Sequence, residues 1–214
     1  MFEPLYDLLM SDVDYEALLN DIKPYLKHDD LIIDAGCGSG YMLIELMKQG
    51  YRAIGLDVSS KMLSLAEEKM RSEHLMTELY EHDLRKPMLG QADVILAMFD
   101  VVNYFKGVKN VFKNIHRALY PQGKFIFDCY QESVLEDYDG YVEDESEPVA
   151  YEWQMHVSGR KLIHQVTHDQ EIDRITQYVY PLQDYLNILD SIGFDVVVRP
   201  SIDPRKHLVI ATKR

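Results

Sequence analysis

The chain has little cysteine and lacks a long apolar run. Its 214 residues include only two cysteines, Cys37 and Cys129, which are too few for a disulfide framework or a cysteine metal cage. No stretch of about eighteen consecutive apolar residues is present, so we expect no transmembrane helix. The N-terminal segment is acidic and lacks the basic residues that open a signal peptide. We therefore expect a single cytoplasmic domain that spans residues 1–214.

Positive charge is also scarce. The chain carries 22 Lys and Arg against 36 Asp and Glu, a net charge of −14. Binding to a nucleic acid backbone requires a basic face, and no cluster of basic residues supplies one. Lys106, Lys109 and Lys113 have the spacing of an ordinary solvated helix face. We therefore do not expect nucleic acid as a partner, although net charge alone does not exclude a local basic patch.

The most informative segment of the chain is residues 31–59. It opens with a short apolar run at residues 31–33, which is typical of a buried parallel strand. Three glycines follow at alternate positions: Gly36, Gly38 and Gly40. Residues without a Cβ permit a tight turn and a close approach of the backbone to a ligand. The pattern predicts a strand that leads into a ligand-binding turn.

A helix and a second strand follow the glycines. Residues 41–48 carry an apolar stripe at helical spacing, and Gly50 would end that helix. Residues 53–56 form the next apolar run, which places Asp57 at the carboxyl end of a strand. A carboxylate there can accept hydrogen bonds from both hydroxyls of a ribose, and ligands of open α/β sheets bind across this edge.

The spacing of the glycines distinguishes between nucleotide classes. The pattern is GxGxG, whereas a dinucleotide fingerprint is GxGxxG; Tyr41 and Leu43 stand where the last glycine would be needed. The segment DAGCGSG instead resembles motif I of the class I S-adenosylmethionine-dependent methyltransferases. The resemblance implies that Asp34 holds the amino group of the methionine moiety and that Asp57 holds the ribose. The alternative is a glycine-rich turn in another α/β protein.

Two later segments resemble the same family. Residues 79–84 fit its third strand, which implies that Asp83 and Leu84 contact the adenine. Residues 92–99 fit its fourth strand, and the following FDVVNYF resembles small bacterial methyltransferases related to glycine and sugar-amine N-methylating enzymes. That resemblance implies that three residues face the transferred methyl group and orient the acceptor: Asp100, Asn103 and Tyr104.

The start of the chain resembles the lead-in of these methyltransferases. There, N-terminal tyrosines fold over the methionine end of the cofactor; a structural role is the alternative. The complete set of cofactor-binding residues that the resemblance implies is Tyr6, Tyr15, Asp34, Ala35, Gly36, Gly38, Gly40, Asp57, Val58, Met62, Asp83, Leu84 and Phe99.

The expected fold is a Rossmann-like, doubly wound α/β sheet of seven strands in the order 3-2-1-4-5-7-6. A helix is expected at 108–119 and a turn at 121–124, where LYPQGKFIFD resembles the family's L-x-P-G-G segment with Gln122 in place of the first glycine. We further expect an antiparallel β insertion after strand five, within residues 129–180. Its strands are predicted at 149–157, 162–168 and 174–180, after an acidic loop or short helix.

Three histidines of the insertion are candidate ligands of a metal ion. His164 and His168 share one face of a strand, and His156 lies nearby, but the sequence pairs no carboxylate or cysteine with them. We therefore expect no metal and interpret them as ordinary polar positions, one of which could serve as a general base. The acidic, aromatic insertion would suit a cationic or amine acceptor through charge attraction and cation–π contact.

The sequence thus predicts in-line transfer of a methyl group from S-adenosylmethionine to nitrogen or oxygen of a small molecule. Proximity, alignment and exclusion of water would supply much of the acceleration, and no general base is identified. Two alternatives stay open at this point: a methyltransferase that acts on tRNA or a protein, and a non-enzymatic S-adenosylmethionine-binding regulator. The sequence does not indicate the oligomeric state.

Overall fold

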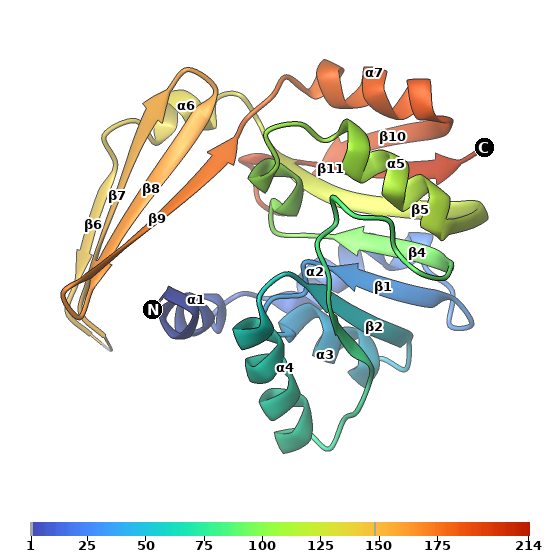
Figure 1. Cartoon of the computed structure of the whole chain (residues 1–214), viewed down its shortest axis with the longest axis horizontal. Helices are drawn as coiled ribbons and strands as arrows, with labels where there is room; N and C mark the ends of the chain where they lie inside the picture. Colours follow the sequence, from blue (N-terminus) through green and yellow to red (C-terminus); the bar gives the residue numbers. More distant parts are fainter. Residues whose placement is uncertain (1, 148) are drawn as a thin grey trace.

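The computed structural model describes residues 2–147 and 149–214. Seven strands form its large sheet: β1 (Leu31–Ala35), β2 (Arg52–Asp57), β3 (Leu79–Glu81), β4 (Ala92–Ala97), β5 (Leu119–Tyr130), β10 (Phe194–Pro200) and β11 (Lys206–Lys213). Their order is β10-β11-β5-β4-β1-β2-β3, and β11 runs antiparallel to both of its neighbours. This confirms the predicted order 3-2-1-4-5-7-6 and the Rossmann-like fold (Figure 1).

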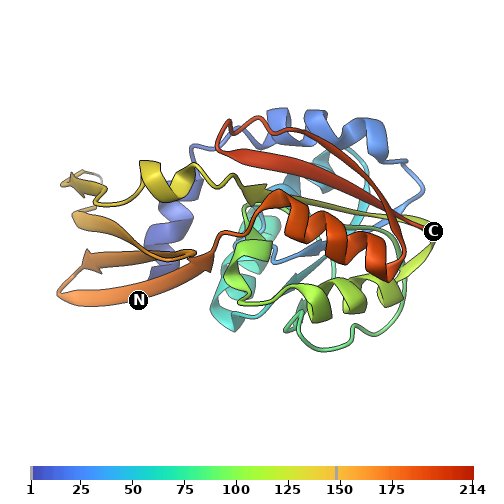
Figure 2. The same cartoon turned by 90° about the horizontal axis from the view of Figure 1, so that it is seen from above.

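Helices cover both faces of this sheet, because successive residues of a strand point to opposite sides. Ile32 packs in the cluster that holds α2 (Tyr15–Ile22) and α3 (Tyr41–Lys48), together with part of α4 (Ser60–Ser72). Its neighbour Ile33 packs in the cluster that holds α5 (Lys109–Ala118) and α7 (Leu182–Ile192). The two layers are visible on opposite sides of the sheet in Figures 1 and 2. Alternate residues of the apolar run at 31–33 therefore pack into the hydrophobic cores on opposite faces of the sheet.

The segment before strand five differs from expectation. The predicted turn at 121–124 is an irregularity within β5, where the pairing with β4 shifts register between Ala92 and Val94. Gln122 adopts a positive φ of 64°, and a Cβ on Gly123 would lie 2.9 Å from the carbonyl oxygens of Asp93 and Tyr120. The backbone of β4 lies too close for a side chain at 123. The glycine thus permits a bulge in a continuous strand rather than a turn.

The insertion forms a four-stranded antiparallel sheet of its own. Its strands are β6 (Val142–Glu145), β7 (Tyr151–Ser158), β8 (Lys161–His168) and β9 (Glu171–Tyr178). The three predicted strands are present, but the expectation of a loop is wrong at 142–145, which pair with β7. The acidic stretch also contains α6 (Val134–Asp137). Charged residues are common on edge strands, where they discourage further pairing.

The N-terminal helix α1 (Phe2–Met10) contacts both the insertion and helix α4. Leu5 packs against Tyr151 and Val166 of the insertion, while Asp7 forms an ion pair with Lys69 of α4. Figure 1 shows α1 between the foot of the insertion sheet and α4. Two short 3-10 helices, η1 (Lys23–Tyr25) and η2 (Val101–Tyr104), complete the fold. None of the described helices is long and apolar enough to cross a membrane.

Candidate active site

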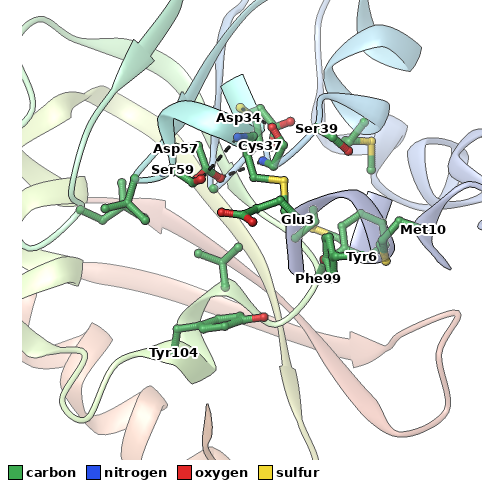
Figure 3. A pocket seen from close by; sticks show the side chains of 18 of the residues that line it. Glu3, Tyr6, Met10, Asp34, Cys37, Ser39, Asp57, Ser59, Phe99 and Tyr104 are labelled. Atoms are coloured by element: carbon green, nitrogen blue, oxygen red, sulfur yellow. Dashed lines mark hydrogen bonds between the residues drawn. The ribbon is translucent and has the colours of Figure 1, made fainter. Parts of the chain in front are cut away.

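A cavity of about 500 Å³ opens at the carboxyl ends of the central parallel strands. Figure 3 shows side chains from the glycine loop, β2, η2 and α1 converging on it. Most of the residues predicted from the sequence line this cavity: Tyr6, Tyr15, Asp34, Gly36, Gly38, Asp57, Val58, Met62, Asp83, Leu84, Phe99 and Tyr104. Four others are not among its lining residues: Ala35, Gly40, Asp100 and Asn103.

Asp34 is the last residue but one of β1; it lines the cavity and is almost fully buried. Burial raises the pKa of its carboxyl to about 7, and the nearby Asp57 adds to the shift. Among the described residues, none donates a hydrogen bond to its buried Oδ2. A buried carboxylate oxygen without a donor is costly, so this atom fits the ammonium group of a bound methionine moiety.

Asp57 lies at the carboxyl end of β2, as the sequence predicts. Its Oδ2 accepts the backbone N–H of Gly38 and its Oδ1 accepts that of Ser59, both at 2.8 Å. Burial raises the pKa of this carboxyl, although the backbone N–H groups oppose the shift. Each oxygen keeps a further acceptor position. The fixed carboxylate therefore suits a vicinal diol such as the hydroxyls of a ribose.

The glycines meet different steric needs. A Cβ on Gly36, at φ +85°, would lie 2.6 Å from Cγ2 of Val101, so this position permits close packing within the protein. A Cβ on Gly40, the N-cap of α3, would lie 2.9 Å from the Cβ of Ala66. At Gly38 no protein atom lies within 4 Å of such a Cβ. Gly38 therefore leaves open space at the cavity wall, which a ligand can approach.

The part of the cavity where the resemblance places the adenine contains an ion pair that the sequence did not indicate. The guanidinium of Arg85 donates to both oxygens of Asp83, with its Nη2 2.7 Å from Oδ2. These hydrogen bonds lower the pKa of Asp83 to about 2. An adenine amine at Asp83 would therefore share its acceptor with Arg85. Met62 is buried here, whereas Val58 is 65% exposed, which leaves Val58 free to cover a base.

The part of the cavity where the resemblance places the methionine moiety is aromatic. Tyr15 stacks on Tyr41 with ring centroids 5.0 Å apart and lies tilted against Phe99 at 5.4 Å. Tyr6 lines the same part of the cavity (Figure 3). Burial raises the pKa of both Tyr6 and Tyr15, so both are neutral phenols near neutral pH. These residues form a wall that can exclude water.

Only one of the three predicted catalytic residues faces the cavity. Tyr104 lines it, whereas Asn103 is fully buried. The Asn103 amide donates to the Tyr178 carbonyl at 2.8 Å, and its oxygen accepts the Tyr130 N–H at 3.2 Å. The expectation that Asn103 orients the acceptor is therefore corrected: its polar atoms join η2, β5 and the end of β9.

Asp100 is corrected in the same way. Its carboxylate is buried and forms an ion pair with Lys206, and it accepts a hydrogen bond from the side chain of Gln177. Burial lowers the pKa of the Lys206 ammonium, but Asp100 and Asp128 outweigh that effect and raise it well above the usual value. No sequence pattern pointed to Lys206, because its partners lie far away along the chain.

The structure also adds residues to the cavity wall. Glu3 and Met10 from α1, and Asp173 and Arg174 from β9, line it. Glu3 and Tyr6 are three residues apart on one helix, a spacing that places them on one face. That spacing was the available signal for Glu3. The sequence predicted that one edge of the insertion covers the active site, but it did not indicate which residues of β9 line the cavity.

Two histidines of the insertion, His164 and His168, are buried and hydrogen-bonded, whereas His156 is exposed. Nε2 of His164 lies 2.9 Å from Oε1 of Gln177, and Nε2 of His168 lies 2.9 Å from Oδ2 of Asp173. Ligand atoms of His168, Glu171 and Asp173 lie within 4.8 Å of one another. The carboxylates come from the next strand, which corrects the expectation that none accompanies the histidines. The expected absence of a metal stays a prediction.

Comparisons with known proteins agree with the fold of this chain. Residues 32–123 match the family model of a methyltransferase domain. A putative methyltransferase of Bacillus subtilis, YqeM, is 29% identical over 91% of this chain and 85% of its own length. A methyltransferase structure from Clostridium acetobutylicum superposes with a TM-score of 0.85 at 20% identity, covering 99% of this chain and 97% of the other. CalS10, an amino pentose methyltransferase from Micromonospora echinaspora solved with S-adenosylmethionine, superposes with a TM-score of 0.77 at 18% identity. The match covers 98% of this chain and 97% of CalS10. The chain therefore carries a methyltransferase domain, and its fold is that of S-adenosylmethionine-dependent methyltransferases.

Proposed function

We propose that this enzyme methylates the nitrogen of a small-molecule amine. The observation that carries the proposal is the composition of the cavity wall beyond the cofactor loop. Two carboxylates, Glu3 and Asp173, and two phenols, Tyr6 and Tyr104, line it. Arg174 is the basic residue on the same stretch of β9, and its Nε donates to Gln165 at 3.4 Å. Carboxylates and aromatic rings together favour a cationic ligand.

Direct methyl transfer requires no covalent bond between the protein and the reactants. S-adenosylmethionine supplies a methyl group on a sulfonium sulfur, and its S–CH3 bond breaks, with the electron pair left on sulfur, as the N–CH3 bond forms. The amine must lose its proton before it attacks, because only the free lone pair can form the new bond. Glu3 would attract the ammonium form and accept a proton from it, while Tyr6 and Tyr104 would exclude water and hold the nitrogen in line.

The choice of nitrogen over oxygen rests on charge. An alcohol acceptor gains nothing from an acidic wall, whereas an amine is concentrated there by attraction. CalS10, which shares the fold, is an amino pentose methyltransferase, and this agrees with an amine acceptor. A tRNA acceptor would meet a chain of net charge −14, which opposes phosphate binding.

The test is a panel of paired acceptors with methyl-labelled S-adenosylmethionine. Each amine is matched with the alcohol and the carboxylate of the same skeleton, and bulk tRNA and a mixed protein sample complete the panel. We expect label in amines only, and a raised acceptor KM in Glu3→Gln with unchanged cofactor affinity. Label in alcohols, tRNA or protein, or no single-turnover transfer to any acceptor, would overturn the proposal.

A further inference from the structure

A chain of buried hydrogen bonds links the end of β4 to the insertion. The indole N–H of Trp153 lies 3.1 Å from Nδ1 of His164, and Nε2 of His164 lies 2.9 Å from Oε1 of Gln177. The amide of Gln177 then donates to Asp100, whose other oxygen accepts from Lys206. His164 is 5% exposed and Gln177 is 2% exposed. These contacts cross three strands of the insertion and end in the large sheet.

The partners fix the direction of every bond in this chain. An indole N–H only donates, so Nδ1 of His164 must be the unprotonated nitrogen. The proton of a neutral His164 is then on Nε2 and points to the oxygen of Gln177. Asp100 can only accept, which orients the Gln177 amide nitrogen toward it. Burial lowers the pKa of His164, in agreement with the neutral ring.

The position of the chain ties it to the cavity. Asp100 is the N-cap of η2, the short helix that carries Tyr104. Gln177 lies on β9, the strand that contributes Asp173 to the cavity wall. Asn103 of η2 also donates to the carbonyl of Tyr178 on β9. The contacts between η2 and β9 therefore determine how far Tyr104 stands from Asp173.

We propose that His164 and Gln177 are positioning residues, which hold the insertion against η2 and thereby set the acceptor end of the cavity. Neither residue is among those that line the cavity. Two apolar clusters also bury side chains of the insertion; one includes Leu5 of α1 and the other includes Val134 of α6. Apolar contacts are not directional, so they do not fix the register of β9 against η2. The directed polar chain supplies that register, because a shift of β9 would leave buried polar groups without partners.

The kinetic part of the inference rests on the proposed function. Gln177→Glu keeps the size of the side chain but sets a carboxylate against Asp100. Gln165→Glu, on the opposite face of the same sheet, makes the identical chemical change beside Arg174. We expect the acceptor KM to rise roughly tenfold or more in Gln177→Glu, with S-adenosylhomocysteine affinity unchanged, and no effect of Gln165→Glu.

A second readout needs no acceptor at all. Trp153 is the only tryptophan, so the protein gives one indole N–H resonance in a ¹H–¹⁵N spectrum. Gln177→Met does not touch Trp153, yet it removes the acceptor for Nε2 of His164 and frees the ring to change tautomer. We expect this resonance to move in Gln177→Met and in the His164→Phe variant, but not in Gln165→Glu.

Three results would overturn the inference. They are an indole resonance that is unchanged in Gln177→Met, an acceptor KM that is unchanged in Gln177→Glu, and a loss of S-adenosylhomocysteine binding in both Gln177 variants. If the wild-type enzyme methylated no amine, the proposed function would fail, while the resonance would still decide whether the hydrogen bonds act as one chain.

Discussion

The backbone N–H of Gly38 donates a 2.8 Å hydrogen bond to Oδ2 of Asp57. This contact joins the loop after β1 to the end of β2, and Ser59 holds the other carboxylate oxygen from the start of α4. The carboxylate is therefore oriented before any ligand arrives. Pre-orientation lowers the cost of binding, because little freedom is lost on association.

Asp57→Ala should weaken S-adenosylhomocysteine binding by about 100-fold or more. Two hydroxyl hydrogen bonds to a carboxylate are lost, each worth roughly 1.5–3 kcal/mol. Calorimetric titration measures the effect. Asp57→Asn is the matched variant, since it keeps the shape and should retain more affinity than alanine. Unchanged affinity in Asp57→Ala would place the ribose elsewhere.

Cofactor binding should weaken as the pH falls below about 7, the pKa of Asp34 in the free protein. An ammonium ligand pairs with the ionised carboxylate, so a protonated Asp34 must first release its proton. The apparent affinity should fall by up to about tenfold per pH unit. Titration in buffers of different ionisation enthalpy should reveal proton release near pH 6.

Asp34→Asn is the control for this pH dependence. It cannot ionise, so its weaker binding should show no proton release linked to residue 34. A wild-type protein that binds without proton release at pH 6 would show that Asp34 is already ionised or does not face the ammonium.

Two glycine substitutions should separate folding from binding. Gly36→Ala should lower both the unfolding temperature and cofactor affinity, because its Cβ would clash with Val101 at 2.6 Å. Gly38→Ala meets no protein atom within 4 Å, so its cost to stability should be about 1 kcal/mol from the positive φ alone. Its loss of cofactor affinity should be larger. Thermal unfolding and titration on the same samples provide the comparison, and equal effects in both assays would contradict it.

Lys206→Met should destabilise the fold by about 3–5 kcal/mol, since it leaves the carboxylates of Asp100 and Asp128 buried without their cation. Urea unfolding measures this loss. Adding Asp100→Asn should recover part of the stability, because it removes one of the two uncompensated charges. A Lys206→Met variant as stable as the wild type would mean that water or another cation replaces the ammonium.

The strands and the glycine turn around the cavity could be predicted because their signal is local. Residues 31–57 contain the strand, the glycines and the acid in one short stretch. The conformational preference of each of these residues depends mainly on its neighbours in the sequence. The roles of Asp100 and Asn103 could not be predicted. Their partners, such as Lys206, Gln177 and the Tyr178 carbonyl, lie 75 to 106 residues away. The sequence shows that such groups exist but not which of them meet.

The edge strand β6 illustrates another limit. Its residues, VEDE, have the composition of a solvated loop, and their strand conformation depends on pairing with β7. At Gln122, a residue with a side chain adopts the positive φ at which the family pattern carries glycine. Pairing across the sheet sets both conformations, whereas local preference alone would oppose them.

The most direct test of the cofactor site is calorimetric titration of the wild-type protein with S-adenosylmethionine and S-adenosylhomocysteine, with NAD as the control. We predict tight, one-to-one binding of the first two ligands and none of NAD, because the GxGxG loop and Asp34 fit a methionine moiety rather than a pyrophosphate. Failure of folded protein to bind either ligand, or binding of NAD in their place, would contradict this assignment.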